Sequence, residues 1–496
     1  MSSHPPQPSH PFSRILAAEI DGRTQTIRYR QSQLYRLQST LLKHLPELKD
    51  AILAYSGNTT EEAEIEIYLA FKELRHHYLL LNLEESLEEE YRVAKGRDNP
   101  GWKRGVGIVY IIVQTTHTLF YSVVAPLSAA VAAGNCVIVE LPKNTTSLVS
   151  LLRKLLVESL DGDTFAISDE RPDEQFLSQT ILVSQEQHLD ALPAASRCNI
   201  ITSPSTSRTI AVVDRTANID AAAGLLVSAR FAFNGRSPYA PDIVLVNEFV
   251  MQPFLASVVR HSSRYLAEHD GAVKSGEQKK LRQDPKTSLL GSIQTGSETR
   301  IVVSGASGGV VEVLDRTSAL LQTKINERLL LVHAVSSLDD AIDLSNSGEQ
   351  LLATYAFASP AAGKYLVQFI DAHASFVNHV PYEMLVGPAP PTNAPVNPQT
   401  RYTTDLFQVP RPQFTIKTAT TKLIEASVLN GSEMAAAPEF SEVVAPLPPT
   451  KQKPGKKIGF FEQGIISGGI VTVLSFIAVA STVGYYGVSF TRRLFS

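Results

Sequence analysis

Cysteine is scarce in this chain, and Cys136 and Cys198 are the only two among 496 residues. Two thiols exclude a disulfide framework and a metal site built from four thiolates, so a reducing compartment is expected. The N-terminal segment MSSHPPQPSHPF also lacks the apolar core of a signal peptide and the Arg-rich run of a transit peptide. Residues 1–12 are therefore expected to form a disordered tail.

A large excess of charge of one sign is missing as well. The formal net charge is −4, which gives no strong basic field and argues against nucleic acid as a partner. Apolar residues make up 44% of the chain and charged residues 19%, as in ordinary folded proteins. A chain of 496 residues is long enough for two or three domains, so the sequence indicates a multidomain globular body.

The clearest local pattern is GVGIVYIIVQTTHTLFYSVVAPLSAAVAAGNCVIVELPKNT. Residues 106–113 are rich in Val and Ile, a helix of small residues follows, and residues 136–139 form a second apolar strand. Gly134 suits the end of that helix, because glycine adopts a left-handed backbone readily. This order predicts a β-α-β unit and hence an α/β fold, while the leucine spacing upstream predicts helices across residues 13–92.

Several motifs resemble those of the aldehyde dehydrogenases. Pro126 and residues 132–135 stand where that family has Pro-Leu and Ala-Ala-Gly-Asn, and FNGRSPYAP resembles its nucleophile segment, with Gly235 and Pro241 matching. The N-terminal helices and an apolar C-terminal helix are similar to those of class 3, fatty-aldehyde-type members. Across residues 13–415 the resemblance implies a Rossmann-like cofactor domain, an α/β catalytic domain and a small bridging hairpin used for dimerisation. Further matching positions are Leu352, Ala353, Tyr355 and Phe357.

The nucleophile implied by the resemblance is absent. In the family's Gly-Gln-x-Cys motif, Arg236 replaces the glutamine and Pro238 replaces the cysteine. Proline has no nucleophile with which to attack a carbonyl and no N–H with which to hold the resulting oxyanion. In an active enzyme the neighbouring Ser237, or Cys198, would have to supply the nucleophile, and neither has a base defined by a motif.

The other two catalytic positions are altered too. By the same resemblance, Pro204 stands at the general-base glutamate, Arg208 at the nearby lysine, and His117 at the asparagine of the oxyanion hole. A histidine still donates a hydrogen bond. No cysteine or serine is tied to His117 by a motif, so we expect a structural histidine that is packed or partly exposed.

The cofactor-binding positions implied by the resemblance have also changed. Glu140 stands at the lysine that approaches the adenosine ribose, and Lys324 and Asn326 occupy the two positions that contact the nicotinamide end. No glycine occurs between Gly162 and Gly224, where the family has a glycine turn before a helix N-terminus. We therefore assign no cofactor on this basis, and an active enzyme would use NAD or NADP.

Three further candidates favour structural roles. His76 and His77 are adjacent on a helix and point about 100° apart, so a solvated helix face is expected and no metal site. The turn at residues 304–311 has glycines without a following Lys-Ser/Thr and is not a phosphate loop. Asn378 is expected to be a structural residue at a strand end.

The C-terminal region predicts a membrane anchor. Residues 427–457 are rich in Ala, Pro, Ser and Lys and are expected to form a linker, and residues 464–490 carry no charge and are long enough for a transmembrane helix. Lysines before this helix outnumber the arginines after it, so the body is expected to face the cytosol. The flanking residues are Lys451, Lys453, Lys456, Lys457, Arg492 and Arg493.

Together these patterns predict an aldehyde dehydrogenase-like, tail-anchored protein with lost or strongly reduced chemistry, which forms a homodimer and binds a partner or a small apolar aldehyde or lipid. One alternative is NAD(P)-dependent oxidation of a long-chain or isoprenoid aldehyde at a membrane surface, and another is a non-enzymatic membrane scaffold. The expected domains are residues 13–210 (helices and Rossmann-like domain), 211–380 (catalytic-type domain) and 381–426 (bridging and return segment).

Overall fold

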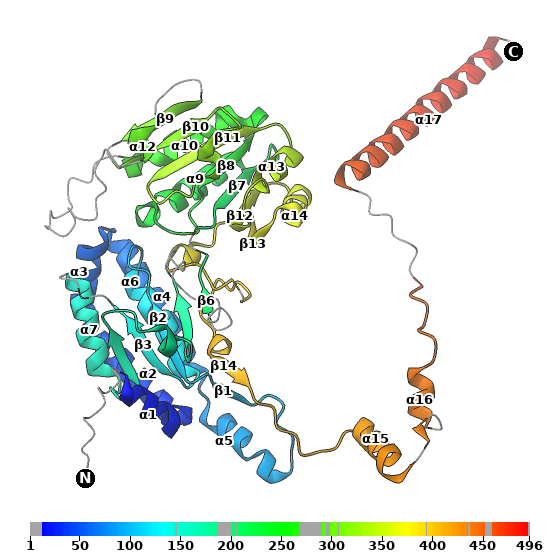
Figure 1. Ribbon diagram of the computed structural model, residues 1–496. Coiled ribbons are helices and arrows are strands. Elements are labelled where there is room, and N and C mark those ends of the chain that lie inside the picture. Colours follow the sequence, from blue (N-terminus) through cyan, green and yellow to red (C-terminus); the bar gives the residue numbers. More distant parts are fainter. Residues whose placement is uncertain are drawn as a thin grey trace, which may run out of the picture. The chain divides into compact units, whose positions relative to one another are not determined.

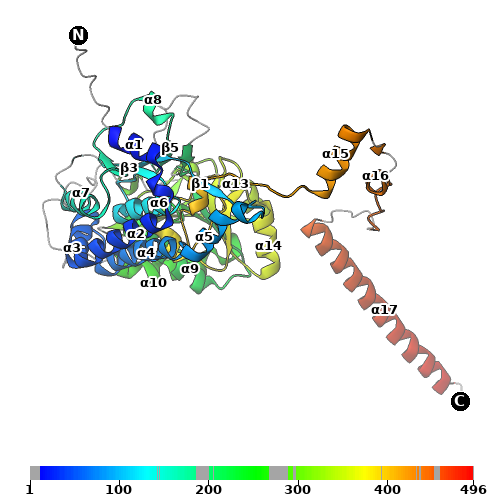
Figure 2. The same cartoon turned by 90° about the horizontal axis from the view of Figure 1, so that it is seen from below.

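The computed structural model describes residues 12–494 except 142, 144–145, 186–199, 205, 267–288, 294–297, 306, 393, 432, 435–436 and 452–458. The chain divides into two compact units, Met1–Ile416 and Lys417–Ser496. The first unit contains both large sheets (Figures 1 and 2). The three hydrophobic core clusters of the described residues also lie in this unit.

A five-stranded parallel sheet with strand order β4-β3-β2-β5-β6 organises the first part of this unit. The predicted β-α-β unit is confirmed as β2, α6 and β3. Every residue of α6 is buried, and its many Ala, Ser and Val side chains allow close packing. The elements are β2 (Ile108–Ile112), α6 (Leu119–Ala132), β3 (Cys136–Glu140), α7 (Ser147–Ser159), β4 (Phe165–Ser168), α8 (Glu174–Leu177), β5 (Ile181–Ser184) and β6 (Ile200–Thr202).

The predicted N-terminal helical region consists of five helices and two short 3-10 turns. Leu34, Leu37 and Leu41 are fully buried, because their spacing places them on one face of α2. Helix α4 begins with a capping box in which Thr59 and Glu62 satisfy each other's backbone N–H groups. The elements are α1 (Ser13–Asp21), η1 (Arg23–Gln25), α2 (Ile27–Lys43), α3 (Leu45–Ser56), α4 (Thr60–Leu79), α5 (Leu83–Tyr91) and η2 (Val93–Lys95).

The expected boundary of the N-terminal tail was wrong at its last residue. Phe12 is 8% exposed and its ring stacks on that of Phe176, with 5.1 Å between the centroids. Phe12 therefore belongs to the folded body, because burying its aromatic ring against Phe176 is favourable. The rest of the predicted tail, residues 1–11, lies outside the described residues.

A seven-stranded sheet with strand order β13-β12-β7-β8-β11-β10-β9 organises the second part of the unit. All neighbours are parallel except the edge strand β9, which runs antiparallel to β10. The α/β fold is thus confirmed. The elements are β7 (Thr209–Val213), α9 (Ile219–Phe231), η4 (Ala232–Gly235), β8 (Ile243–Asn247), η5 (Glu248–Val250), α10 (Met251–Leu266), α12 (Leu289–Ser292), β9 (Thr299–Gly305), β10 (Gly308–Val313), η6 (Ala319–Gln322), β11 (Leu329–Val335), α13 (Leu338–Ser345), β12 (Leu351–Phe357), α14 (Pro360–Phe369) and β13 (Ala372–Val377).

A two-stranded antiparallel sheet joins distant parts of the chain. Strand β1 (Lys103–Gly105) pairs with β14 (Gln408–Pro410), which follows η7 (Tyr382–Leu385) and η8 (Thr404–Phe407). The predicted return segment, residues 381–426, therefore pairs through β14 with β1, the strand that precedes β2 in the chain. Its residues 417–426 belong instead to the second unit.

The second unit contains α15 (Ala419–Asn430), α16 (Pro438–Val443) and α17 (Phe460–Leu494). The linker predicted at 427–457 thus carries the end of α15 and all of α16. No buried residue occurs in either helix, as expected for a segment without enough apolar surface to form a core. Within α17, residues Glu462–Gly484 are long and apolar enough to cross a membrane.

Candidate functional site

The turn after α9 contains the altered nucleophile motif, and its backbone is left-handed at three successive residues. Phe233, Asn234 and Gly235 have φ values of 49°, 58° and 70°. A Cβ at Gly235 would overlap the carbonyl of Glu327, so only glycine fits there. The backbone N–H of Phe233 donates to Glu62 Oε1 at 2.7 Å, which ties the turn to the start of α4.

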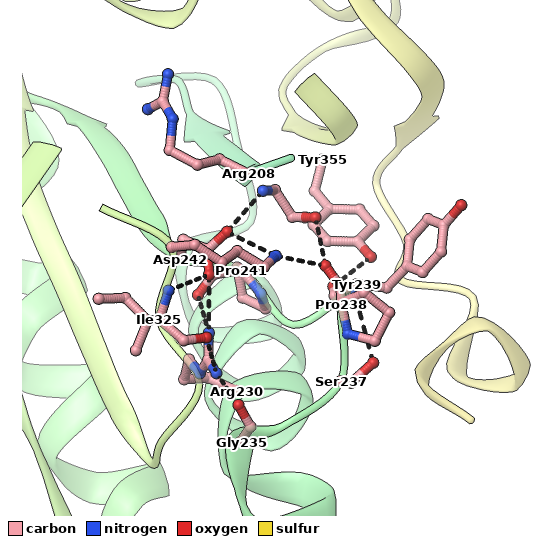
Figure 3. Close-up of polar contacts among 12 residues, drawn as sticks. Arg208, Arg230, Gly235, Ser237, Pro238, Tyr239, Pro241, Asp242, Ile325 and Tyr355 are labelled. Carbon is pink, nitrogen blue, oxygen red and sulfur yellow. Dashed lines mark hydrogen bonds and ion pairs between the residues drawn. The ribbon is translucent and has the colours of Figure 1, made fainter. Parts of the chain in front are cut away.

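Asp242 anchors the far end of this segment from inside the protein (Figure 3). Its side chain is 1% exposed and accepts hydrogen bonds from the backbone N–H groups of Thr209, at 2.7 Å, and Ile325, at 3.0 Å. It also pairs with the fully buried guanidinium of Arg230 at 3.2 Å and with Lys324 Nζ at 3.0 Å. One carboxylate thus joins β7, α9, β8 and the chain that leads into β11.

Arg230 and Lys324 extend this network to the backbone of the motif. The guanidinium of Arg230 donates to the carbonyls of Gly235 and Ile325, and Lys324 Nζ donates to the carbonyl of Pro238 at 2.7 Å. Burial lowers the pKa of both cations, while the nearby Asp242 opposes that shift. The arrangement is a cross-linked structural core, because every charged group in it is directed at a protein partner.

Pro238 and Ser237 are both buried within this core. The carbonyl of Pro238 accepts from Lys324 and from Thr209 Oγ1, the latter at 3.0 Å. Ser237 is 0% exposed, and its Oγ accepts the backbone N–H of Tyr239 at 3.2 Å. Among the described residues, no hydrogen bond links Ser237 to a histidine, carboxylate or lysine, so nothing there activates its hydroxyl.

Pro204 and His117, which stand at the positions of the base and the oxyanion donor, have structural surroundings. Pro204 is half-buried, and the neighbouring Arg208 donates from Nη1 to the carbonyl of Leu321 at 2.7 Å. His117 is 3% exposed and its Nε2 lies 2.9 Å from the carbonyl of Leu385. Burial lowers the pKa of His117 to about 4, so the ring is neutral and donates to that carbonyl.

At the cofactor positions the side chains are paired or turned to solvent. Glu140 ends β3, where its carboxylate accepts from the Tyr110 hydroxyl at 2.8 Å and pairs with Arg171 Nη2 at 3.1 Å. Asn326 is exposed, whereas Lys324 belongs to the Asp242 core. Lys324 and Asn326 therefore do not form one surface, although they are separated by a single residue.

Cys136, the one cysteine within the described part of the chain, is not an alternative nucleophile. Cys136 is buried in β3, and burial raises the pKa of its thiol to about 12, so it stays protonated at neutral pH. Cys198 lies outside the described residues.

The predicted solvated helix face was correct for His76 and wrong for His77. His76 is exposed, but His77 is 0% exposed, with Nδ1 2.8 Å from Ser128 Oγ and Nε2 2.8 Å from the carbonyl of Tyr402. Burial lowers the pKa of His77 to about 4. It is buried because it lies on the side of α4 that packs against α6. Within the described part of the chain, no cluster of three His, Cys, Asp or Glu side chains could hold a metal.

Sequence reasoning missed two buried carboxylates on the same face of α4. Glu66 is 0% exposed and its Oε1 accepts the backbone N–H of Tyr121 at 3.2 Å, near the start of α6. Glu73 is 3% exposed and accepts from the Tyr121 hydroxyl and from the backbone N–H of Arg401. The available signal was their position in the inward stripe that also contains Ala63, Ala70 and Leu74.

Burial raises the pKa of Glu66 to about 7, against backbone hydrogen bonds that lower it. The folded protein then holds this proton more tightly than the unfolded chain does, whose carboxyl has a pKa near 4.5. Stability from this group is therefore complete below about pH 4.5 and declines as the pH rises toward 7. His77 and His117 act oppositely, because their lowered pKa makes stability fall as the pH drops from 6.5 toward 4.

Comparison with known proteins shows what this chain is similar to. No family model matches the chain. Mouse (Mus musculus) aldehyde dehydrogenase family 3 member B3 is 26% identical over 377 residues, which cover 71% of this chain and 76% of the relative. The 4,4'-diaponeurosporen-aldehyde dehydrogenase of Staphylococcus aureus is 22% identical over 364 residues, covering 68% and 76%.

Solved structures show the same fold. A substrate-bound Staphylococcus aureus AldH superposes with a TM-score of 0.64 at 19% identity, covering 82% of this chain and 94% of the other. An NAD-dependent benzaldehyde dehydrogenase from Corynebacterium glutamicum gives a TM-score of 0.61 at 15% identity, covering 82% and 89%. The chain thus has the fold of the aldehyde dehydrogenases, and its sequence is similar to those of class 3, fatty-aldehyde-type members of that superfamily.

Proposed function

We propose that this chain is a tail-anchored, aldehyde dehydrogenase-like pseudoenzyme whose dehydrogenase chemistry is lost or strongly reduced, and that it acts by binding a partner or an apolar ligand. The observation that carries the proposal is the environment of Pro238. At the position of the family's nucleophilic cysteine, this chain has a buried proline whose carbonyl accepts hydrogen bonds from Lys324 and Thr209. A structural core occupies the place of a reactive centre.

Aldehyde oxidation in this family needs a thiolate, a base to activate water and donors for an oxyanion. Pro238 and Pro204 have no group for the first two tasks. His117 has one donating ring nitrogen, and that nitrogen lies 2.9 Å from the carbonyl of Leu385. A hydroxyl as deeply buried as that of Ser237 could replace the thiolate only with a base beside it.

The cofactor positions support the same proposal. A nicotinamide dinucleotide carries negative phosphates, and NADP adds a further phosphate on the adenosine ribose. Glu140 brings negative charge where the family has a lysine, and the carboxylate already pairs with Arg171. Binding would have to break this pair and place like charges together, so affinity for NADP in particular should be low.

The proposed anchor is α17. Its 23-residue apolar span, Glu462–Gly484, extends about 34 Å as a helix, enough to cross a hydrocarbon core of about 30 Å. Basic residues are more numerous before the helix than after it, which favours a cytosolic body by the positive-inside rule.

The test uses the purified full-length chain in detergent. We expect no saturable heat on titration with NAD or NADP, and no NADH on incubation with NAD and decanal. The mouse family 3 member B3 enzyme serves as the control that the assay conditions support turnover. NADH formation that saturates with decanal and disappears in Ser237→Ala would refute the loss of chemistry.

A second candidate function is oxidation of a long-chain or isoprenoid aldehyde at the membrane. The apolar span favours it, and so does the name of the Staphylococcus aureus relative, a 4,4'-diaponeurosporen-aldehyde dehydrogenase. Replacing decanal by an isoprenoid aldehyde in the same assay distinguishes this active enzyme from the proposed pseudoenzyme. Turnover of the isoprenoid substrate alone would identify an active enzyme of narrow specificity.

A further inference from the structure

Helix α2 has two faces of opposite character. Its buried face includes Leu34, Leu37 and Leu41, all 0% exposed. The opposite face spans an arc of about 120° at 100° per residue and runs for about 22 Å along the helix. We call it the α2 outer face, and its exposed members are Arg28, Ser32, Tyr35, Arg36, Ser39, Leu42 and Lys43.

The charges of this face have one sign. Helix α2 contains no aspartate or glutamate, so Arg28, Arg36 and Lys43 face solvent without an acidic neighbour on their own helix. Among the described residues, none of the three forms a hydrogen bond or an ion pair. Arg36 interacts electrostatically with Asp161, but that carboxylate also lies 3.8 Å from Arg23. The α2 outer face therefore presents a net positive charge to a partner.

Large apolar side chains alternate with these cations. Tyr35 is 61% exposed and Leu42 is 50% exposed, although both lie on a helix with a well-packed inner face. Tyrosine is favoured where an apolar phase meets water, because its ring is apolar and its hydroxyl is polar. Lysine and arginine near an anionic leaflet are attracted by its negative surface potential. A lipid surface satisfies both groups of side chains at once, whereas nucleic acid would leave Leu42 exposed.

We propose that the α2 outer face docks on the surface of an anionic phospholipid membrane. The inference deepens the proposed attachment through α17 and rests on it, because a tethered body meets the lipid surface at high local concentration. The anchor supplies attachment, and the α2 outer face supplies orientation. Each cation should favour the docked state about fivefold, so three together favour it about 100-fold.

The experiment labels the face in the full-length chain. Ser39→Cys in a Cys198→Ser background carries an environment-sensitive fluorophore, and the other thiol, Cys136, is buried. The chain is reconstituted in vesicles of phosphatidylcholine alone or with about 30% phosphatidylserine. We expect a blue shift only with phosphatidylserine, and its loss at about 1 M salt, where charges are screened beyond about 3 Å. The control label at Ser263→Cys, exposed on α10, should not shift.

A charge-matched pair of variants isolates the three cations. The docking variant is Arg28→Gln, Arg36→Gln and Lys43→Gln, and it should lose the shift. The control variant removes three exposed cations from other parts of the first unit, Lys95→Gln, Arg215→Gln and Lys364→Gln, and it should keep the shift. Loss in both variants, or in neither, would overturn the proposal, because net charge alone or apolar contact alone would then explain it.

Vesicle flotation separates this inference from the anchor. If the chain floats with both lipids but the fluorescence does not shift, docking is refuted and the anchor is supported. If the fluorescence shifts equally in both lipids, the anionic surface is refuted as the partner. If the chain floats only with vesicles that contain phosphatidylserine, the anchor is refuted and docking is supported. If it floats with neither kind of vesicle, both the anchor and docking are refuted. A shift that appears without vesicles, together with a doubled mass, would overturn membrane docking and assign the face to a second copy of the chain.

Discussion

Replacing Asp242 by asparagine should destabilise the first unit strongly. The variant keeps the shape of the side chain but removes the anion between Arg230 and Lys324, which are 0% and 11% exposed in their side chains. Two buried cations would then face each other without a counter-charge. Removing one partner of a buried ion pair costs about 3–5 kcal/mol. Since domains are stable by roughly 5–15 kcal/mol, about a fifth or more of the stability should be lost.

The assay follows urea unfolding by the fluorescence of Trp102, the only tryptophan of the chain, which lies in the first unit. Asp220→Asn is the matched control, because Asp220 pairs with Arg260 on the surface, where solvent screens the charges. A double-mutant cycle with Lys324→Met should give a coupling energy of about 0.5–3 kcal/mol. If Asp242→Asn unfolds at the same urea concentration as Asp220→Asn, the network is not structural and the reading of Pro238 loses its support.

Four further results are expected. Glu66→Gln should remove a decline in stability of roughly 3 kcal/mol between about pH 4.5 and 7, seen as a flatter pH profile of urea midpoints than in the parent; an unchanged profile would contradict the raised pKa. Gly235→Ala should cost about 2 kcal/mol or more and lower the melting temperature, because a Cβ would overlap the Glu327 carbonyl; a stability equal to the parent would contradict this. Pro238→Cys should form no NADH from decanal, since Pro204 still stands at the base position; turnover would show that the nucleophile alone was missing. A chain ending at Gly459 should stay in the bottom fraction when phosphatidylcholine vesicles are floated, whereas the full chain should rise with the vesicles; equal flotation of the two chains would contradict the anchor.

Local patterns were sufficient for the parts of the fold whose cause is local. The β-α-β unit was predictable because strand and helix periodicities are carried by consecutive residues, from Ile108 to Glu140. The proline at the position where the resemblance implies a cysteine, Pro238, was visible in a single short motif. The apolar span of α17 was equally visible, since length and composition alone decide whether a helix can cross a bilayer.

Partners distant in the sequence decided the rest. Asp242 accepts N–H groups from residues 33 and 83 positions away, and His77 reaches a carbonyl 325 positions away, distances over which no local pattern operates. The resemblance puts Lys324 at a position where the family contacts its cofactor. The side chain lies in the Asp242 core, because the packing of β7, β8 and the chain before β11 places an anion beside it. Composition and periodicity thus determined the elements, and the resemblance to aldehyde dehydrogenase motifs implied the missing reactive groups. Only tertiary packing decided that Asp242, Arg230 and Lys324 pair with one another beside Pro238, since the low dielectric of the interior requires each buried charge to find a partner there.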